Sequence, residues 1–114
     1  MNEEIKSIFG DSLTVGDKTM PVAHLTYKGP SKTFVTWTVI EETPALSAND
    51  EDLISVCGVD IDIFSDGNYS DIVKEVKKTM KKNEWMWTGD SPEMYEEETR
   101  LYHKTCSFEK ERIL

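Results

Sequence analysis

The sequence predicts an α+β fold, with an antiparallel sheet of about four to five strands and two helices packed on one face. The first observation behind this prediction is the alternation in residues 33–41, where Val35, Trp37 and Val39 face one way. A period of two is typical of a half-buried antiparallel strand. The second observation is an apolar stripe at helical spacing in residues 69–80, directly after another strand pattern.

The expected order of elements is α-β-β-β-α-β-β in a single domain, 1–114, because 114 residues suffice for one core and not for two. A first helix is expected at 2–9, where Ile5, Ile8 and Phe9 share one face. A loop of ten residues is often functional in a compact domain, and one is expected before the central strand. The elements expected after the first helix are a loop at 10–16, strands at 20–28 and 33–41, and a loop at 43–52 (TPALSANDED).

The second half of the chain predicts the longest strand and the second helix. Residues 53–64 form the strand, with Val59, Ile61 and Ile63 on one face. Asn68 is a candidate N-cap for the helix at 69–80. The remaining expected elements are a strand at 84–88, an acidic loop or single helical turn at 93–99, a strand at 100–109 and a loose tail at 110–114.

Charge is unevenly placed along the chain. The formal net charge is −9, which argues against nucleic-acid binding through phosphate neutralisation and is most simply explained by solubility. No basic residue lies between Lys32 and Lys74. An acidic surface and a basic helix could meet between subunits, or could neutralise each other within one chain. The acids of the interval are Glu41, Glu42, Asp50, Glu51, Asp52, Asp60, Asp62, Asp66 and Asp71, and the lysines that follow are Lys74, Lys77, Lys78, Lys81 and Lys82.

The residue pattern indicates no catalytic constellation. Asp60 and Asp62 share a strand face, and they could meet His103 at a metal if their strands paired in register. An exposed sheet face with ordinary polar residues is the more economical interpretation. No serine or cysteine lies in a nucleophile motif, and no glycine cluster suits a phosphate. We therefore expect no enzyme activity, no cofactor and no metal.

The three tryptophans and two cysteines divide between core and surface. Trp37 is expected in the core, whereas Trp85 and Trp87 are expected on one face of a short strand, where they either cover the helix or meet a partner. Cys57 and Cys106 are expected to be buried and reduced. The N-terminus lacks an apolar run and no segment is long enough to span a bilayer, so a cytoplasmic setting without membrane contact is expected.

Four stretches of the chain resemble small tail-completion proteins of long-tailed bacteriophages and prophages, which are grouped with the tail terminator proteins of siphophages. The stretches are HLTYKG, TFVTWTVIEETPAL, VDIDIFSDGNYSDIVKEVKKTM and SPEMYEEETRLYHKTCSFE. Together they run from about His24 to Glu109. The most specific pieces are IDIFS, directly followed by a helix, and Y-E-x-E-T-x-L-Y-x-K-x-x-x-F-E, which spans Tyr95 to Glu109.

The resemblance implies an α+β protomer of a ring, typically of six copies, without catalytic activity. Such a ring caps the head-proximal end of the tail tube, stops its polymerisation and joins it to the head connector. The implied partners are further copies of the chain, the tail tube protein and the head-tail connector protein, with DNA only as passing cargo. The ring can need the tube end as a template, which leaves a monomer in isolation. The implied location is the host bacterial cytoplasm during assembly and then the virion tail or neck.

Ring closure requires a heterologous interface, in which different patches of neighbouring copies meet. The candidate interface residues are Asp50, Glu51, Asp52, Asp60, Asp62, Lys74, Lys77, Lys78, Lys81, Trp85 and Trp87. The alternative function is a small non-enzymatic α+β protein-binding module that acts as a monomer or dimer. It would recruit its partner through the strand of Trp85 and Trp87 and the loop at 43–52.

Overall fold

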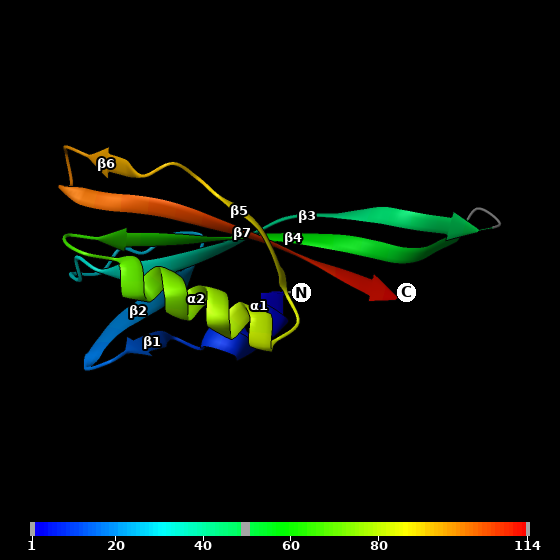
Figure 1. The fold of residues 1–114 in the computed structure, drawn as a ribbon, viewed down its shortest axis with the longest axis horizontal. Helices are drawn as coiled ribbons and strands as arrows, with labels where there is room; N and C mark the ends of the chain where they lie inside the picture. Colours follow the sequence, from blue (N-terminus) through cyan, green and yellow to red (C-terminus); the bar gives the residue numbers. More distant parts are fainter. Residues whose placement is uncertain (1, 49–50, 114) are drawn as a thin grey trace.

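The chain forms two helices and seven strands within residues 2–48 and 51–113, the part that the computed structural model describes (Figure 1). The α+β class is therefore confirmed. The elements are α1 (Asn2–Phe9), β1 (Ser12–Val15), β2 (Lys18–His24), β3 (Phe34–Ala48), β4 (Glu51–Ser65), α2 (Ser70–Lys82), β5 (Met86–Asp90), β6 (Met94–Glu96) and β7 (Leu101–Ile113). Neither of these helices is long and apolar enough to cross a membrane.

The sheet is mixed and larger than expected, so the prediction of four to five strands in a purely antiparallel sheet is wrong. Its strand order is β1-β2-β3-β4-β7-β5, and β6 pairs with the far end of β7. The parallel pair is β2 with β3, in which Val22 lies opposite Val35. The predicted strand 20–28 ends early because Leu25 has φ 68, a left-handed conformation that stops an extended strand. The expected loop at 10–16 contains β1, which turns into β2 through Gly16 at φ 63.

The predicted loop at 43–52 is wrong, because β3 continues to Ala48 and β4 begins at Glu51. The two strands pair antiparallel along their whole described length, with register shifts between Val39 and Glu41 and again around Leu46. Each bulge inserts an extra residue and interrupts the period-two pattern by which a strand is recognised from sequence. The prediction of a loose tail is also wrong for 110–113, because β4 is long enough to pair with β7 as far as Ile113.

The helices were predicted more accurately than the strand ends. The first helix matches its expected range, and α2 begins one residue later and ends two residues later than expected. Asn68 Oδ1 accepts a hydrogen bond of 2.9 Å from the backbone N–H of Ser70, so its side chain occupies the start of α2 as expected. The strand expected at 84–88 lies at Met86–Asp90, and the acidic segment after it contains the short strand β6.

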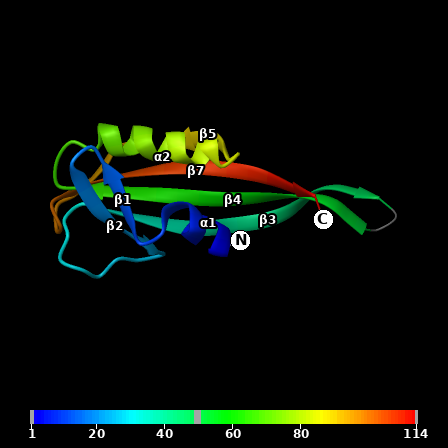
Figure 2. The same ribbon diagram turned by 90° about the horizontal axis from the view of Figure 1, so that it is seen from below.

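Both helices lie over the same face of the sheet, which Figure 2 shows from the helix side. We call this the helix face and the opposite one the open face. The alternating residues of the three central strands point to the helix face and join the helices in one core cluster. Its strand members include Val35, Trp37, Val59, Ile61, Ile63, Cys106 and Phe108, and its helix members are Ile5, Phe9, Ile72, Val76 and Met80.

The end of the β3–β4 hairpin projects from this body (Figure 1), in a molecule whose principal extents are 52 × 26 × 23 Å. We call residues 43–48 and 51–56 the arm. Burial of apolar side chains under the helices holds the body together, whereas the arm extends past both helices. The fold therefore consists of a two-layer body and a projection, which has three strands at its base, where β7 pairs with residues 54–56, and two strands beyond it.

Candidate interaction surfaces

Charge is sorted between the two faces of the sheet by strand alternation. Along the end of β7, Glu109 and Glu111 alternate with Lys110 and Arg112, so the acids lie on the open face and the bases on the helix face. Cross-strand pairing places the two aspartates of β4 beside the acids: Asp60 pairs with Ser107 and Asp62 with Thr105. In the described parts of β3, β4 and β7, the open face carries no lysine or arginine. Its acids are Glu41, Asp60, Asp62, Glu109 and Glu111.

The aspartates of the open face are tied across to β7. Ser107 Oγ donates a hydrogen bond of 2.7 Å to Asp60 Oδ1. Asp62 Oδ1 accepts a bond of 2.5 Å from Thr105 Oγ1 and lies 2.8 Å from His103 Nε2. The structure thus brings together two of the three residues considered for a metal, Asp62 and His103, but Asp60 bonds to Ser107 instead. Among the described residues, no group of three or more His, Cys, Asp or Glu side chains could hold a metal ion.

A row of aromatic rings crosses the same face near the end away from the arm. The centroid distances along the row are 4.6 Å for Tyr27–Phe34, 4.7 Å for Phe34–Phe64 and 4.1 Å for Phe64–His103. Because the rings stack on one another, their faces are already covered, and the row offers edges rather than a platform for a base or sugar ring. The row therefore supports strand register through cross-strand pairs. The row was not predictable from local patterns, because Phe34, Phe64 and His103 lie on three different strands and Tyr27 lies in the loop after β2.

Lys77 of α2 belongs to a cluster of interacting side chains with Asp90 and Trp87 on the helix face. Lys77 Nζ lies 2.8 Å from Asp90 Oδ2 and 4.3 Å from the centre of the Trp87 ring. Trp87 Nε1 donates a bond of 2.8 Å to Asp90 Oδ1. Burial by itself would raise the pKa of Asp90, but the hydrogen bonds from Lys77 and Trp87 outweigh it and lower that pKa below its ordinary value. This lysine is therefore neutralised within one chain, by Asp90 rather than by the acidic interval.

The two candidate interface tryptophans have different environments. Trp85 is 2% exposed and lies in the core with the helices, which is the helix-covering alternative, so its place among the candidate interface residues is wrong. The reason is the end of α2: the Trp85 backbone N–H donates to the Met80 carbonyl at 2.9 Å, which turns the chain back beneath the helix. Trp87 is 52% exposed and remains available at the surface. The neighbouring lysines Lys74, Lys78, Lys81 and Lys82 are exposed on α2.

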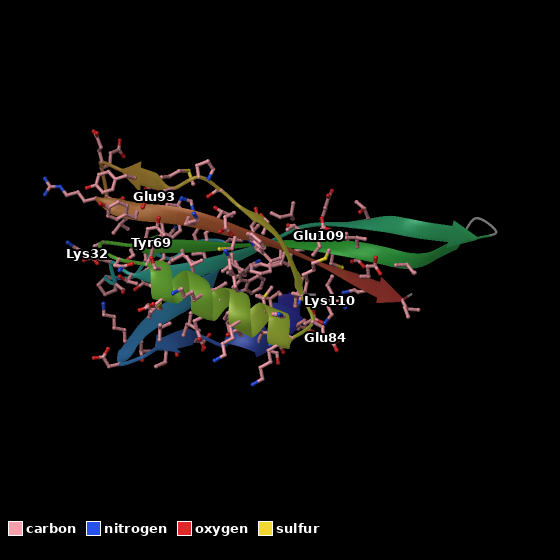
Figure 3. The ribbon with its side chains drawn as sticks, in the orientation of Figure 1. Lys32, Tyr69, Glu84, Glu93, Glu109 and Lys110 are labelled. Carbon is pink, nitrogen blue, oxygen red and sulfur yellow. The ribbon has the colours of Figure 1, made fainter. Side chains whose placement is uncertain are left out.

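Charged contacts tie the end of β7 to the two helices. Arg112 Nη2 donates a bond of 2.8 Å to Glu4 Oε2 in α1. Lys110 Nζ lies 3.5 Å from the other oxygen of Glu4 and donates to the Asn83 carbonyl at 3.2 Å, close to the end of α2 (Figure 3). Burial is the main cause that raises the pKa of the Cys57 thiol nearby, followed by the charge of Glu42. These contacts therefore hold the end of β7 against both helices, and the raised pKa keeps the Cys57 thiol protonated.

Two of the three predicted interface acids of the expected loop at 43–52, Glu51 and Asp52, belong to the arm. Asp50 lies outside the described residues. Glu51 and Asp52 begin β4, where their backbones pair with Ala48 and Ser47. The structure describes the backbones of Glu51 and Asp52 and not their side chains.

Two hollows lie at the end of the body away from the arm. The larger, of about 480 Å³, separates the β1–β2 turn from the start of α2 and is lined by polar residues that include Lys18, Ser65 and Asp71. Beside it, Tyr69 Oη donates a bond of 2.6 Å to Glu93 Oε1 (Figure 3), and this bond raises the pKa of Tyr69 to about 12. Neither arrangement pairs a nucleophile with a base.

No protein-family model matches the chain, and no curated protein matches it. The functional inference therefore depends on the sorted charge of the sheet, the Lys77–Asp90–Trp87 cluster and the arm.

Proposed function

We propose that this chain is a ring-forming structural protein of a bacteriophage or prophage, a tail terminator or closely related neck component. In this proposal it caps the tail tube and joins it to the head connector. The resemblance of residues 24–109 to tail-completion proteins suggests the class. The observation that carries the proposal is the contrast between the acidic open face of the sheet and the exposed lysines of α2 on the helix face.

The sorted charge supports a heterologous assembly. Acids gather on the open face, whereas exposed lysines line α2 on the helix face, so one copy presents two different, complementary surfaces. Complementary patches on different sides of a protomer generate rings when the rotation closes. A closed ring with the open face turned inward would repel the phosphates of passing DNA instead of binding them.

The remaining polar groups favour a structural over a catalytic role. Asp62 contacts Thr105 and His103, and these contacts tie β4 to β7 across the open face. Burial raises the pKa of Cys106 to about 12, which keeps its thiol protonated. The side chains that could perform chemistry are thus used to hold strands together.

The proposed position of the protein in the phage particle implies its partners and its location. Copies of the chain would form the ring, typically of six, with the tail tube protein on one side and the head-tail connector protein on the other. The arm, which projects beyond the body, supports contact with one of these neighbours. Assembly would take place in the host cytoplasm and the product would reside in the virion tail or neck.

The test is a phage or prophage in which this gene is deleted, examined by electron microscopy. We expect tails of abnormal length that fail to join heads, and rescue by the wild-type gene. A triple variant, Lys74→Glu, Lys78→Glu and Lys81→Glu, should not rescue, whereas the matched change Lys28→Glu, on a loop away from α2, should. Tails of normal length joined to heads in the deletion strain would refute the proposal.

A second candidate, a protein-binding module, is favoured by Trp87. This exposed ring is held in place by Asp90 and Lys77, and Met86 beside it is also exposed, a combination found at the centres of interfaces. A chain that stays monomeric and binds one partner unrelated to tails, with affinity lost in Trp87→Ala and kept in Tyr95→Ala, would favour this candidate over the ring.

A further inference from the structure

We infer that copies of this chain join edge to edge, with the outer edge of β3 in one copy paired to the outer edge of β7 in the next. The occupant of both edges is a second copy of the chain. This inference rests on the proposed ring and names the backbone contact that would close it.

The first edge belongs to β3. On the side away from β4, β3 pairs with β2 at Val35–Trp37, and beyond Trp37 no described strand continues this pairing. Pro44 has no N–H to donate, so the segment of β3 best able to accept a new strand is 38–43. An unpaired row of backbone N–H and C=O groups is a ready template for another strand.

The second edge belongs to β7. On the side away from β4, β5 pairs with β7 only as far as Glu109, and the described part of the chain offers no partner for residues 110–113. These residues hold an extended conformation because β4 pairs with their other side, from Cys57 to Ile54. The end of β7 is therefore a preformed strand with one free edge.

The directions of the two strands suit a ring. Both β3 and β7 run antiparallel to the strand between them, β4, so they are parallel to each other and lie on opposite sides of it. In a ring whose axis runs along the strands, rotation of one copy onto the next preserves strand direction, so β7 meets the neighbouring β3 in parallel. The contact uses two different edges and is heterologous, as ring closure requires.

Side chains at the two edges fit the pairing. Two large aliphatic side chains, Ile40 on β3 and Ile113 on β7, are 53% and 90% exposed. On the helix face, Glu42 of β3 would lie on the same side of the joined sheet as Lys110 and Arg112 of β7. Like charges at Glu41 and Glu111 on the open face oppose the pairing, but both side chains are exposed and screened by salt. Covering the two isoleucines favours the joined state.

The experiment is sedimentation velocity of the full chain up to millimolar concentration, with variants that place a charge on one edge at a time. We expect the wild type to assemble and Ile40→Lys and Ile113→Lys each to remain monomeric. Met94→Lys, on β6 beside the far end of β7, is the matched control and should assemble as the wild type does. Because all three side chains are exposed, we expect each variant to fold as the wild type does. Circular dichroism checks this.

A mixture of the two edge variants provides the sharper result. The Ile113→Lys copy keeps an intact β3 edge and the Ile40→Lys copy keeps an intact β7 edge, so the mixture should form dimers and nothing larger. In the wild-type assembly, hydrogen exchange should slow at the amides of 38–43 and 110–113. Assembly of either variant alone, larger oligomers in the mixture, or a wild type that stays monomeric would overturn the inference.

The outcome separates this inference from the proposed function. If edge variants assemble normally while the gene deletion still produces defective tails, the edge pairing is wrong and the ring proposal stands. If the wild type never assembles and the deletion strain makes normal tails, both are wrong.

Discussion

Truncation of Ile61 tests whether the core lies on the helix face of the sheet. Ile61 is fully buried in β4, between Trp37 of β3 and Cys106 of β7. The change Ile61→Ala removes three carbon atoms, a loss of roughly 2.4 kcal/mol at ~0.8 kcal/mol for each buried methylene. The cavity left in a rigid sheet adds to this, so we expect a total cost of about 4 kcal/mol. Ile61→Val removes one carbon and should cost about 1 kcal/mol.

The assay is urea unfolding, in which the midpoint shifts while the slope stays constant if only stability has changed. The matched control is Ile40→Ala, the same substitution at a side chain that is 53% exposed on the neighbouring strand. We expect the control to cost less than about 1 kcal/mol in the monomer. Equal losses at the two positions would refute the assignment of a buried helix face and an open face.

Three further predictions concern charge and thiols. Asp90→Asn should cost under about 1 kcal/mol at neutral pH, because the Lys77 pair is partly exposed. Since the folded pKa of Asp90 is lowered, its contribution is present above the unfolded pKa and is lost as pH falls through the folded pKa, so wild type and variant should converge in acid urea titrations. Glu4→Gln should speed hydrogen exchange at the end of β7, where Arg112 loses its ion pair, and unchanged rates would contradict this contact. Cys106 should react with a thiol reagent at pH 8 only on unfolding, because burial raises its pKa to about 12; rapid reaction in the folded state would contradict its burial.

The parts of the fold that were predictable depend on local periodicity. The stripe Ile72, Val76 and Met80 is buried, as helical spacing indicates. The alternating residues of the strands likewise reach the core, since a period of two assigns faces without knowledge of the neighbours. Strand ends were not predictable in this way: the bulges around Ile40 and Leu46 interrupt the alternation, and the ends are held by pairing with another strand.

The candidate surfaces were predictable in part. Asp60, Asp62 and the lysines of α2 were identified from charge alone, but the acids of β7 were missed. The alternation of Glu109, Lys110, Glu111 and Arg112 is the available signal, but only Glu109 lies in the predicted strand 100–109, whereas the other three fall in the expected loose tail. Trp85 was misplaced because its burial depends on how the chain leaves α2.

The sequence by itself determined the α+β class, the helices and the buried side of the three central strands, because these depend on residues three or four positions apart in a helix and two apart in a strand. Only the tertiary structure decided the mixed sheet, the length of the arm and the two free edges. These features depend on contacts between segments far apart in the chain, such as Val22 with Val35 and Ile54 with Ile113. No local pattern records which strand becomes the neighbour of another, and that choice also places the acids of β4 and β7 on one face.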